Sequence, residues 1–248
     1  MKYEMVGLCE TGLVRNVNQD AVFWGKTECG AVCVVADGMG GHSHGEVASN
    51  LIKQTVLQCW ETFTEENCRR GFCDMFDYLK CELEKANQAL YQEYGKKRMC
   101  GSTLVLLFCF QNQYGILYAG DSRIYLKKGF SFIRLTTDEV WENQKNIPKE
   151  ERQNTSHPNY GKLVNAFGSE ADLHMRMMTD VLRGGELFLL CSDGLYKMCT
   201  DKQIKAAMRS VRSGGDGMKA ALMRLKEETE EAGATDNFSI IMLKTDRE

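Results

Sequence analysis

Short runs of consecutive hydrophobic residues, separated by glycine and polar turns, recur along most of the chain. They occupy residues 31–36, 104–110, 114–120, 187–191 and 238–243. Apolar runs of this length between turn residues are typical of strands that are buried on both faces. A weaker alternation over residues 173–178 predicts a strand at the edge of a sheet. The pattern therefore predicts a core of short strands, several of them joined by hairpins.

Other segments follow the period of a helix. Apolar residues recur three or four positions apart within residues 47–63 and 75–94, which predicts two amphipathic helices. A second pair is predicted over residues 201–211 and 216–231, with Thr200 or Asp201 and Asp216 as capping residues. Because amphipathic helices must cover an apolar surface, we predict an α+β fold in which antiparallel sheets are flanked by helix pairs.

Residues 136–168 fit neither pattern. They are polar, and they hold both prolines of the chain, Pro148 and Pro158. Long segments of this composition lie on the surface and often carry function. We interpret this one as a flap within a single domain of residues 1–248, because no Pro-rich or Ser-rich linker divides the chain.

Acidic residues stand at the ends of the apolar runs. Asp37, Asp121 and Asp193 each follow a run, and Asp236 comes just before the last one. These side chains meet at one edge of the fold if the last strand runs antiparallel to the others. Two carboxylates 4 Å apart repel each other by about 4 kcal/mol at an effective dielectric constant near 20. A gathered set therefore predicts a divalent cation, whereas a single acid such as Asp37 can equally be a turn residue at a strand–turn–helix corner.

Charge and composition exclude several functional classes. The formal net charge is −3 with both signs mixed throughout, so no basic surface for nucleic acid is predicted. No run approaches the ~18 apolar residues of a membrane span, and the first residues lack the hydrophobic segment of a signal peptide. The 11 cysteines are odd in number and none form a C-x-x-C pair, which indicates structural thiols in a reducing compartment. We predict a cytoplasmic protein.

Short motifs are distributed over nearly the whole chain. They are GLVRNVNQD at residues 12–20, ADGMGGH at 36–42, GEVAS at 45–49, GST at 101–103, AGDSR at 119–123, LTTD at 135–138, HP at 157–158, CSDGL at 191–195 and GATDN at 233–237. Each is weak alone, but the ordered set is specific. In this set the sequence resembles the metal-dependent Ser/Thr protein phosphatases, the protein phosphatase 2C-like or PPM family, in its compact bacterial form.

The resemblance implies a central β-sandwich of two antiparallel sheets with two Mn²⁺ or Mg²⁺ ions bound at one end. It implies that Asp37 bridges both ions, that the Gly38 carbonyl binds one of them, and that Asp193 and Asp236 bind the other. Asp121 would share a third, weaker ion with Asp193. The alternative for Asp121 is a turn acid that caps its bend or pairs with the arginine two residues later.

The resemblance also implies catalytic roles outside the ion ligands. Arg15 would clamp the substrate phosphate and Asp20 would hold a water in the site; the alternative is an exposed arginine and a turn acid. Gln19 and Met39 depart from the pattern of many eukaryotic members, which have a glutamate ligand and a histidine acid there. His42 is the nearby candidate for that acid, or a surface histidine hydrogen-bonded to a turn. Glu139 and Val140 replace His-Ser of many bacterial relatives.

The activity implied is hydrolysis of phosphoserine and phosphothreonine on proteins by a metal-activated water. Paired metal ions suit this reaction because phosphate monoesters hydrolyse extremely slowly unaided. Phosphoproteins and a cognate bacterial Ser/Thr kinase are the expected partners, and the expected state is a monomer. Two alternatives differ in class: a pseudophosphatase that serves as a binding module, and a hydrolase of small phosphoesters.

Overall fold

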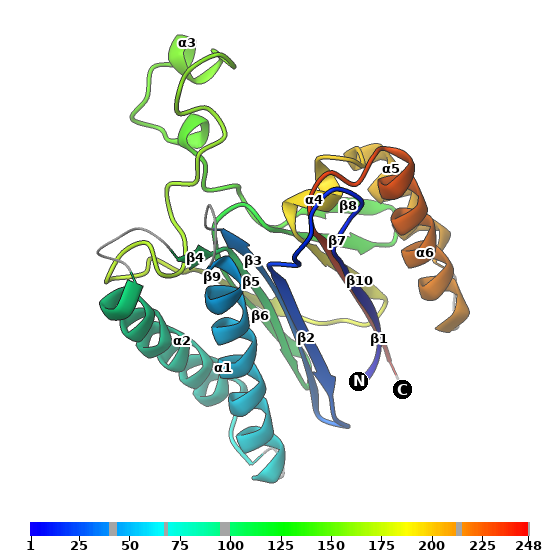
Figure 1. Ribbon diagram of the computed structural model, residues 1–248. Coiled ribbons are helices and arrows are strands. Elements are labelled where there is room, and N and C mark those ends of the chain that lie inside the picture. Colours follow the sequence, from blue (N-terminus) through cyan, green and yellow to red (C-terminus); the bar gives the residue numbers. More distant parts are fainter. Residues whose placement is uncertain (40–43, 67–68, 95–99, 212–214, 248) are drawn as a thin grey trace.

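The computed structural model describes residues 1–39, 44–66, 69–94, 100–211 and 215–247, which form two stacked sheets between two layers of helices (Figure 1). One sheet has the order β1-β11-β10-β7-β8, from β1 (Lys2–Glu10), β11 (Phe238–Asp246), β10 (Glu186–Cys191), β7 (Arg123–Lys128) and β8 (Ser131–Arg134). The other has the order β2-β3-β5-β6-β9, from β2 (Asp20–Lys26), β3 (Gly30–Met39), β5 (Leu104–Phe110), β6 (Gln113–Ala119) and β9 (Arg176–Val181). The short β4 (Gly101–Ser102) pairs with β3. The pairings within both sheets are antiparallel, which confirms the predicted fold class.

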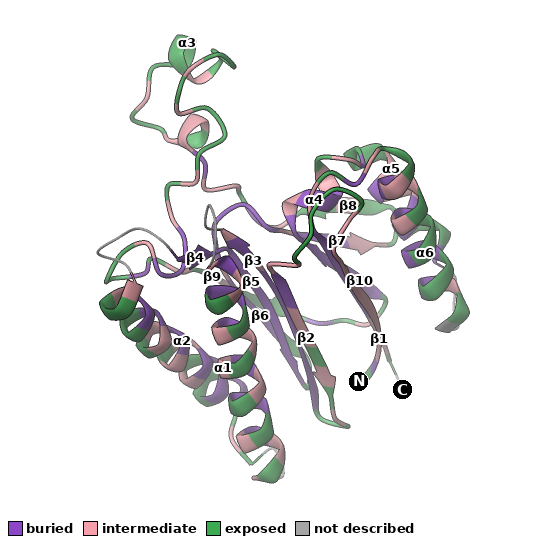
Figure 2. Cartoon of the chain, in the orientation of Figure 1, coloured by how far each residue is buried: buried purple, intermediate pink, exposed green. Residues whose placement is uncertain are grey.

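Two helix pairs cover the outer faces of the sheets (Figure 1). The pair α1 (Gly45–Glu65) and α2 (Phe72–Tyr94) packs on the sheet that contains β3, and the pair α5 (Asp201–Ser210) and α6 (Gly215–Glu231) packs on the sheet that contains β10. A single turn, α4 (Asp193–Tyr196), follows β10. Thr200 caps α5 in a reciprocal capping box with Gln203. Both predicted pairs are confirmed, and the helices turn their buried faces to the sheets (Figure 2).

The central strands read as continuous apolar runs because each of their faces is buried. In β3, Val32 and Val34 pack with the α1–α2 layer, whereas Cys33 and Val35 pack between the two sheets. Successive side chains of a strand point to opposite faces, so a strand in this position needs apolar residues at every position.

Two strand boundaries differ from the prediction. The apolar run ends before Asp37, but β3 continues to Met39, with Asp37 opposite Asp20 of β2 and Gly38 opposite Ser102 of β4. The predicted edge strand is confirmed, but it lies at Arg176–Val181 as β9, beside β6. Backbone pairing does not depend on hydrophobic side chains, so apolar patterns misplace strand ends of this kind.

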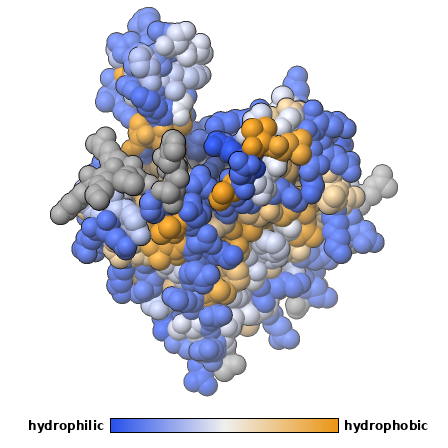
Figure 3. Space-filling view, viewed as in Figure 1, coloured by the Kyte–Doolittle hydropathy of each residue, from blue (hydrophilic) through white to orange (hydrophobic). Residues whose placement is uncertain are grey.

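The predicted flap, residues 136–168, projects from the sandwich between β8 and β9 (Figure 1). It carries the short η2 (Trp141–Asn143) and α3 (Lys149–Arg152), and its outer surface is mostly hydrophilic (Figure 3). The rings of Trp141 and His157 stack at 4.0 Å and 5° inside it. At its base Val140 pairs with Leu163 in an isolated β-bridge.

Among the described helices of the whole chain, none has the length and apolar character that a membrane span requires.

A buried carboxylate joins the ends of β10, β7 and β11. Glu186 Oε1 accepts hydrogen bonds from Lys128 Nζ at 2.6 Å and from the Arg183 amide at 2.9 Å, and Oε2 accepts one from Thr245 Oγ1 at 2.6 Å. Burial alone raises the pKa of this carboxyl, but the hydrogen bonds from Lys128 and Thr245 outweigh it and lower the pKa to about 2. The ionised form is therefore favoured in the folded protein.

We expect Glu186→Gln to lower the free energy of unfolding by about 1–3 kcal/mol at neutral pH, because it removes the charge that Lys128 faces and replaces one of the two acceptor oxygens by an NH₂ donor. The folded pKa of Glu186 lies below its unfolded value of 4.5, so the carboxylate contributes stability above that value and loses it as the pH falls toward about 2. Urea denaturation of both proteins between pH ~6 and ~3 should show the difference shrinking on acidification. A difference that grows toward low pH would contradict this account.

Candidate metal centre and active site

The four acids predicted to gather do gather. Asp37, Asp121, Asp193 and Asp236 all line one cavity of about 330 Å³, although the sequence separates them by up to two hundred residues. Arg15 lines the same cavity, as do Gly161 and Leu163 of the flap. Antiparallel pairing of β11 with β10 places the start of β11 beside the end of β10, which brings Asp236 to Asp193. The cavity therefore lies at one edge of the sandwich, beneath the flap.

The main chain of Asp37 is held by the Gly-Ser-Thr motif of the neighbouring strand. The Asp37 amide donates to Thr103 Oγ1 at 3.1 Å, and the Asp37 carbonyl accepts from the Thr103 amide at 2.9 Å and from Ser102 Oγ at 3.0 Å. At Gly38, a Cβ atom would lie 2.3 Å from the Gly45 carbonyl oxygen and 2.5 Å from that of Gln19. Only glycine fits between β2 and the start of α1, so the position of Asp37 is fixed by backbone packing.

Asn237 ties the segment of Asp236 to the loop that carries Arg15. Its Nδ2 donates to the carbonyl oxygens of Thr11 at 2.8 Å and Val17 at 3.0 Å, and its Oδ1 accepts from the Gln19 amide at 2.9 Å. Arg15 Nη2 then reaches Asp236 Oδ2 at 2.9 Å. Because the Arg15 side chain is 54% exposed, the guanidinium keeps access to solvent on the rim of the cavity.

Asp20 is buried and lies opposite Asp37 in the pairing of β2 with β3. Its Oδ2 accepts hydrogen bonds from Ser192 Oγ and Ser239 Oγ, both at 2.7 Å, while its Oδ1 has no hydrogen-bond partner among the described residues. Burial raises the pKa of Asp20 to about 6, against the lowering effect of the two serine hydrogen bonds. A buried carboxylate oxygen without a partner is costly, and a water or an ion would satisfy it.

Electrostatics favour a cation in this cavity. Burial raises the pKa of Asp37 well above its ordinary value, and the negative charges of Asp20, Asp193 and Asp121 raise it further. Burial and Asp193 likewise raise the pKa of Asp121 to about 6. Carboxylates and a backbone carbonyl are the hard oxygen donors that Mg²⁺ and Mn²⁺ prefer, so the residues present fit divalent ions.

Two basic side chains neutralise part of this charge. Arg15 contacts Asp236, and Lys197 Nζ contacts Asp193 Oδ2. Over the described ranges, no three Asp, Glu, His or Cys side chains form a ready-made ligand cluster. Arg15 and Lys197 thus each engage one carboxylate oxygen, Oδ2 of Asp236 and Oδ2 of Asp193.

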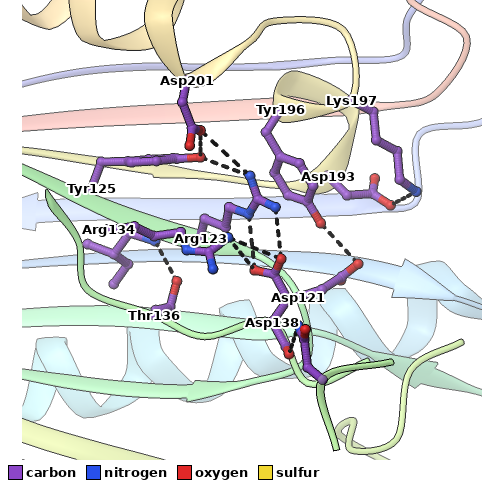
Figure 4. Close-up of polar contacts among 12 residues, drawn as sticks. Asp121, Arg123, Tyr125, Arg134, Thr136, Asp138, Asp193, Tyr196, Lys197 and Asp201 are labelled. Carbon is purple, nitrogen blue, oxygen red and sulfur yellow. Dashed lines mark hydrogen bonds and ion pairs between the residues drawn. The ribbon is translucent and has the colours of Figure 1, made fainter. Parts of the chain in front are cut away.

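One alternative for Asp121 was an ion pair with Arg123, and the structure does not form that pair. Its Oδ2 accepts a hydrogen bond from Tyr196 Oη at 3.0 Å, whereas Arg123 binds Asp138 with Nε–Oδ1 at 3.0 Å and Nη2–Oδ2 at 2.8 Å (Figure 4). The Arg123 guanidinium carbon also lies 3.5 Å from the centre of the Tyr196 ring. Asp121 thus lines the cavity with its carboxylate held by Tyr196 and not by Arg123.

The remaining site predictions fall in different places. His42 lies outside the described residues. Met39 lines the cavity, as does Gln19, whose Nε2 donates to Glu46 Oε2 at 3.1 Å. Glu139 anchors the base of the flap, because its side chain accepts hydrogen bonds from the Gly120 amide, Asn165 and Arg176.

The thiols contribute no nucleophile to the cavity. None of the cysteines in the described part of the chain lines it. Cys9 and Arg15 have the C-x₅-R spacing of a thiol-dependent phosphatase loop, which the sequence interpretation overlooked. Cys9, however, lies within β1, its Sγ accepts from Asn18 Nδ2 at 3.2 Å, and burial raises its pKa. A raised pKa disfavours the thiolate that such a mechanism needs.

Three residues of the site carried no predicted role. Asn237, Tyr196 and Lys197 emerge only from the structure. A signal was available for Lys197, because it follows Asp193 by four residues and an i,i+4 spacing places two side chains on one face of a helical turn. A prediction of a helical turn at Asp193–Tyr196 would therefore have placed the Lys197 side chain beside Asp193.

Comparisons with known proteins identify a family and relatives of this chain. The sequence model of the family described as protein phosphatase 2C matches residues 14–225. The chain is 28% identical to the serine/threonine phosphatase stp of Listeria monocytogenes, over 96% of this chain and 94% of that protein.

Solved structures also superpose on nearly the whole of this chain. The structure of PppA, a key regulatory component of the type VI secretion system in Pseudomonas aeruginosa, superposes with a TM-score of 0.80 at 29% identity, covering 99% of this chain and 98% of that one. The catalytic domain of the serine/threonine protein phosphatase PstP, in complex with two manganese ions, superposes with a TM-score of 0.79 at 25% identity and 99% coverage of both chains.

Proposed function

Because the chain belongs to the protein phosphatase 2C family and is a protein-serine/threonine phosphatase, we propose that it hydrolyses phosphoserine and phosphothreonine at a binuclear Mn²⁺ or Mg²⁺ centre. Asp37 and the Gly38 carbonyl would hold one ion, and Asp37, Asp193 and Asp236 the other. The observation that carries the proposal is the convergence of these acids in one cavity beside Arg15. The relative solved with two manganese ions supports the choice of metal.

When bound, paired ions of this kind lower the pKa of a water and stabilise the charge that develops on the phosphoryl group. The chain's own residues supply the orientation. Arg15, released from Asp236, would bind two phosphate oxygens with its planar guanidinium. Asp20 would accept a hydrogen bond from water at its free Oδ1, with Ser192 and Ser239 fixing the carboxylate. His42, as general acid, remains part of the proposal.

Phosphorylated proteins are the proposed substrates, and a Ser/Thr kinase that phosphorylates them is the proposed opposing partner. We place this reaction in the cytoplasm, in a monomer whose residues 1–248 form one catalytic domain. The presence of all four acids in the cavity favours an enzyme over a pseudophosphatase. Kinetics with a phosphothreonine peptide and with an aryl phosphate test the substrate class: a higher kcat/KM for the aryl ester would favour a hydrolase of small phosphoesters.

Asp121 is proposed to share a third, weaker ion with Asp193. We expect Asp121→Ala to lower kcat and to shift Mn²⁺ activation to higher concentration, while the tighter pair of ions stays bound. Few protein ligands at such a site leave most of the coordination to water, so binding is weak. Isothermal titration with Mn²⁺, beside turnover at graded Mn²⁺, measures both effects. Loss of thermal stability with unchanged metal dependence would identify Asp121 as a turn residue.

The flap is proposed to select among phosphoprotein substrates without supplying a metal ligand. Gly161 and Leu163 reach the acid cavity, and Leu163 with Met39 also lines an adjacent hollow of about 530 Å³. A peptide that extends beyond its phosphorylated residue would pass these residues and reach the outer part of the flap, whereas a small aryl phosphate would stay within the cavity.

We expect replacement of residues 144–158 by a short Gly-Ser linker to change kcat/KM among phosphopeptides by about tenfold, or about 1.4 kcal/mol. Turnover of an aryl phosphate should change much less. The replacement retains Glu139 and Leu163, so the anchored base of the flap is kept. Equal losses on both kinds of substrate would count against a selective role.

A further inference from the structure

The turn after Asp193 places two consecutive side chains on two acids of the cavity. Tyr196 Oη donates to Asp121 Oδ2 at 3.0 Å, and Lys197 Nζ contacts Asp193 Oδ2 (Figure 4). Asp121 and Asp193 are the pair to which the third ion is assigned above. Both acids are therefore already engaged by donors of this chain, one by a neutral hydroxyl and the other by an ammonium group.

Lys197 lies in the negative field of the cavity and not only beside one acid. It lines the cavity, and Asp193, Asp121 and Asp37 all lie close enough to stabilise its positive charge. Its side chain is 55% exposed, so the ammonium can also move out into water. A flexible stem with one strongly hydrated charge suits a group that enters and leaves such a position.

Tyr196, in contrast, is held in place. Arg123 lies over its ring and is itself fixed by Asp138 through two hydrogen bonds. Arg123 Nη1 also donates to Tyr125 Oη at 3.0 Å, and Tyr125 Oη donates to Asp201 at 2.8 Å. This network fixes the turn that carries Lys197, so the lysine stem starts from a fixed point near Asp193.

We propose that Lys197 is a built-in competitor for the third cation, so that an ion can join Asp193 to Asp121 only when Lys197 leaves Asp193. The inference rests on the proposed metal centre. The hydrogen bond from Lys197 goes to Asp193 Oδ2, which leaves Oδ1 as the ligand for the tighter pair of ions. The third ion therefore binds weakly because it displaces a positive charge as well as water. At low Mn²⁺, Lys197 supplies the positive charge at that position.

The test is Mn²⁺ binding to the 248-residue chain by isothermal titration, with metal content checked by elemental analysis. Lys197→Met keeps the stem and removes the charge, and we expect it to tighten the weakest Mn²⁺ site by about tenfold or more, with the tighter sites changed by about twofold at most. Lys197→Arg keeps the charge and should leave the weak site weak. Lys202→Met, an exposed lysine on α5 that does not line the cavity, is the matched control and should bind as the native chain does.

A double variant tests whether the tightened Mn²⁺ site depends on Asp121. Asp121→Ala in the Lys197→Met background should remove the tightened site and leave the tighter pair bound. Melting temperatures in EDTA verify that each variant folds, and Lys197→Gln serves as a second charge-removing variant. An unchanged or weaker third site in both Lys197→Met and Lys197→Gln overturns the inference, as does a gained site that survives Asp121→Ala.

The same titration separates this inference from the metal centre on which it rests. A native chain that binds no Mn²⁺ pair overturns the proposed centre and this inference together. A native chain that binds the pair, while the third site does not respond to the charge of residue 197, overturns this inference alone.

Discussion

Removal of divalent metal should abolish phosphopeptide turnover, and added Mn²⁺ or Mg²⁺ should restore it. Without ions the substrate phosphate would meet Asp37, Asp193 and Asp236 in one cavity. Each pair of like charges 4 Å apart costs about 4 kcal/mol at an effective dielectric constant near 20, so the dianion is excluded. Arg15 and Lys197 supply two positive charges in this cavity, which do not offset three carboxylates and a phosphate dianion together.

The measurement is turnover of a phosphothreonine peptide after exhaustive EDTA treatment, followed by titration with Mn²⁺ or Mg²⁺. Circular dichroism of the stripped protein controls for unfolding. Full activity in protein shown by elemental analysis to hold no metal would falsify the binuclear centre.

Asp37→Ala should impair catalysis more completely than Arg15→Ala. Asp37 is the proposed bridge between two ions, so its loss should lower kcat on the order of 10³-fold, equivalent to about 4 kcal/mol. Arg15 contributes charged hydrogen bonds to the phosphate worth about 1.5–3 kcal/mol, so its removal should appear mainly as a KM raised about 10- to 100-fold.

Asp37→Asn adds a readout that activity alone does not give. Burial and the neighbouring acids raise the pKa of Asp37, so a neutral side chain relieves repulsion inside the cavity. In EDTA this variant should melt at or above the native temperature even though its kcat falls. Asp77→Ala, which replaces an exposed acid on the outer helix α2, is the matched control and should change neither quantity. An active Asp37→Ala enzyme would refute the site, and a kcat loss in Arg15→Ala as deep as that of Asp37→Ala would contradict the order.

Local patterns in the sequence determined the architecture and most of the acids of the site. Unbroken apolar runs identified β3, β5 and β10 as doubly buried strands, and helical periodicity identified both helix pairs. The position of an acid after such a run identified Asp121 and Asp193, because strand ends in a sandwich collect at its edges. These properties depend on neighbouring residues along the chain, so the sequence carries them directly.

The tertiary structure decided which of these residues meet and what else meets them. Asp37 lies inside β3 and not after it, because β2 pairs with Asp37 itself and β4, which comes much later in the sequence, pairs with Gly38 and Met39. Asp20 has one satisfied and one unsatisfied oxygen because Ser192, just after β10, and Ser239 of β11 both donate to the same oxygen, Oδ2. Tyr196 lies on Asp121 because antiparallel pairing of β7 with β10 brings two distant turns together. Contacts of this kind are set by strand register and by the direction of single side chains, which no local pattern of hydrophobic and polar residues encodes.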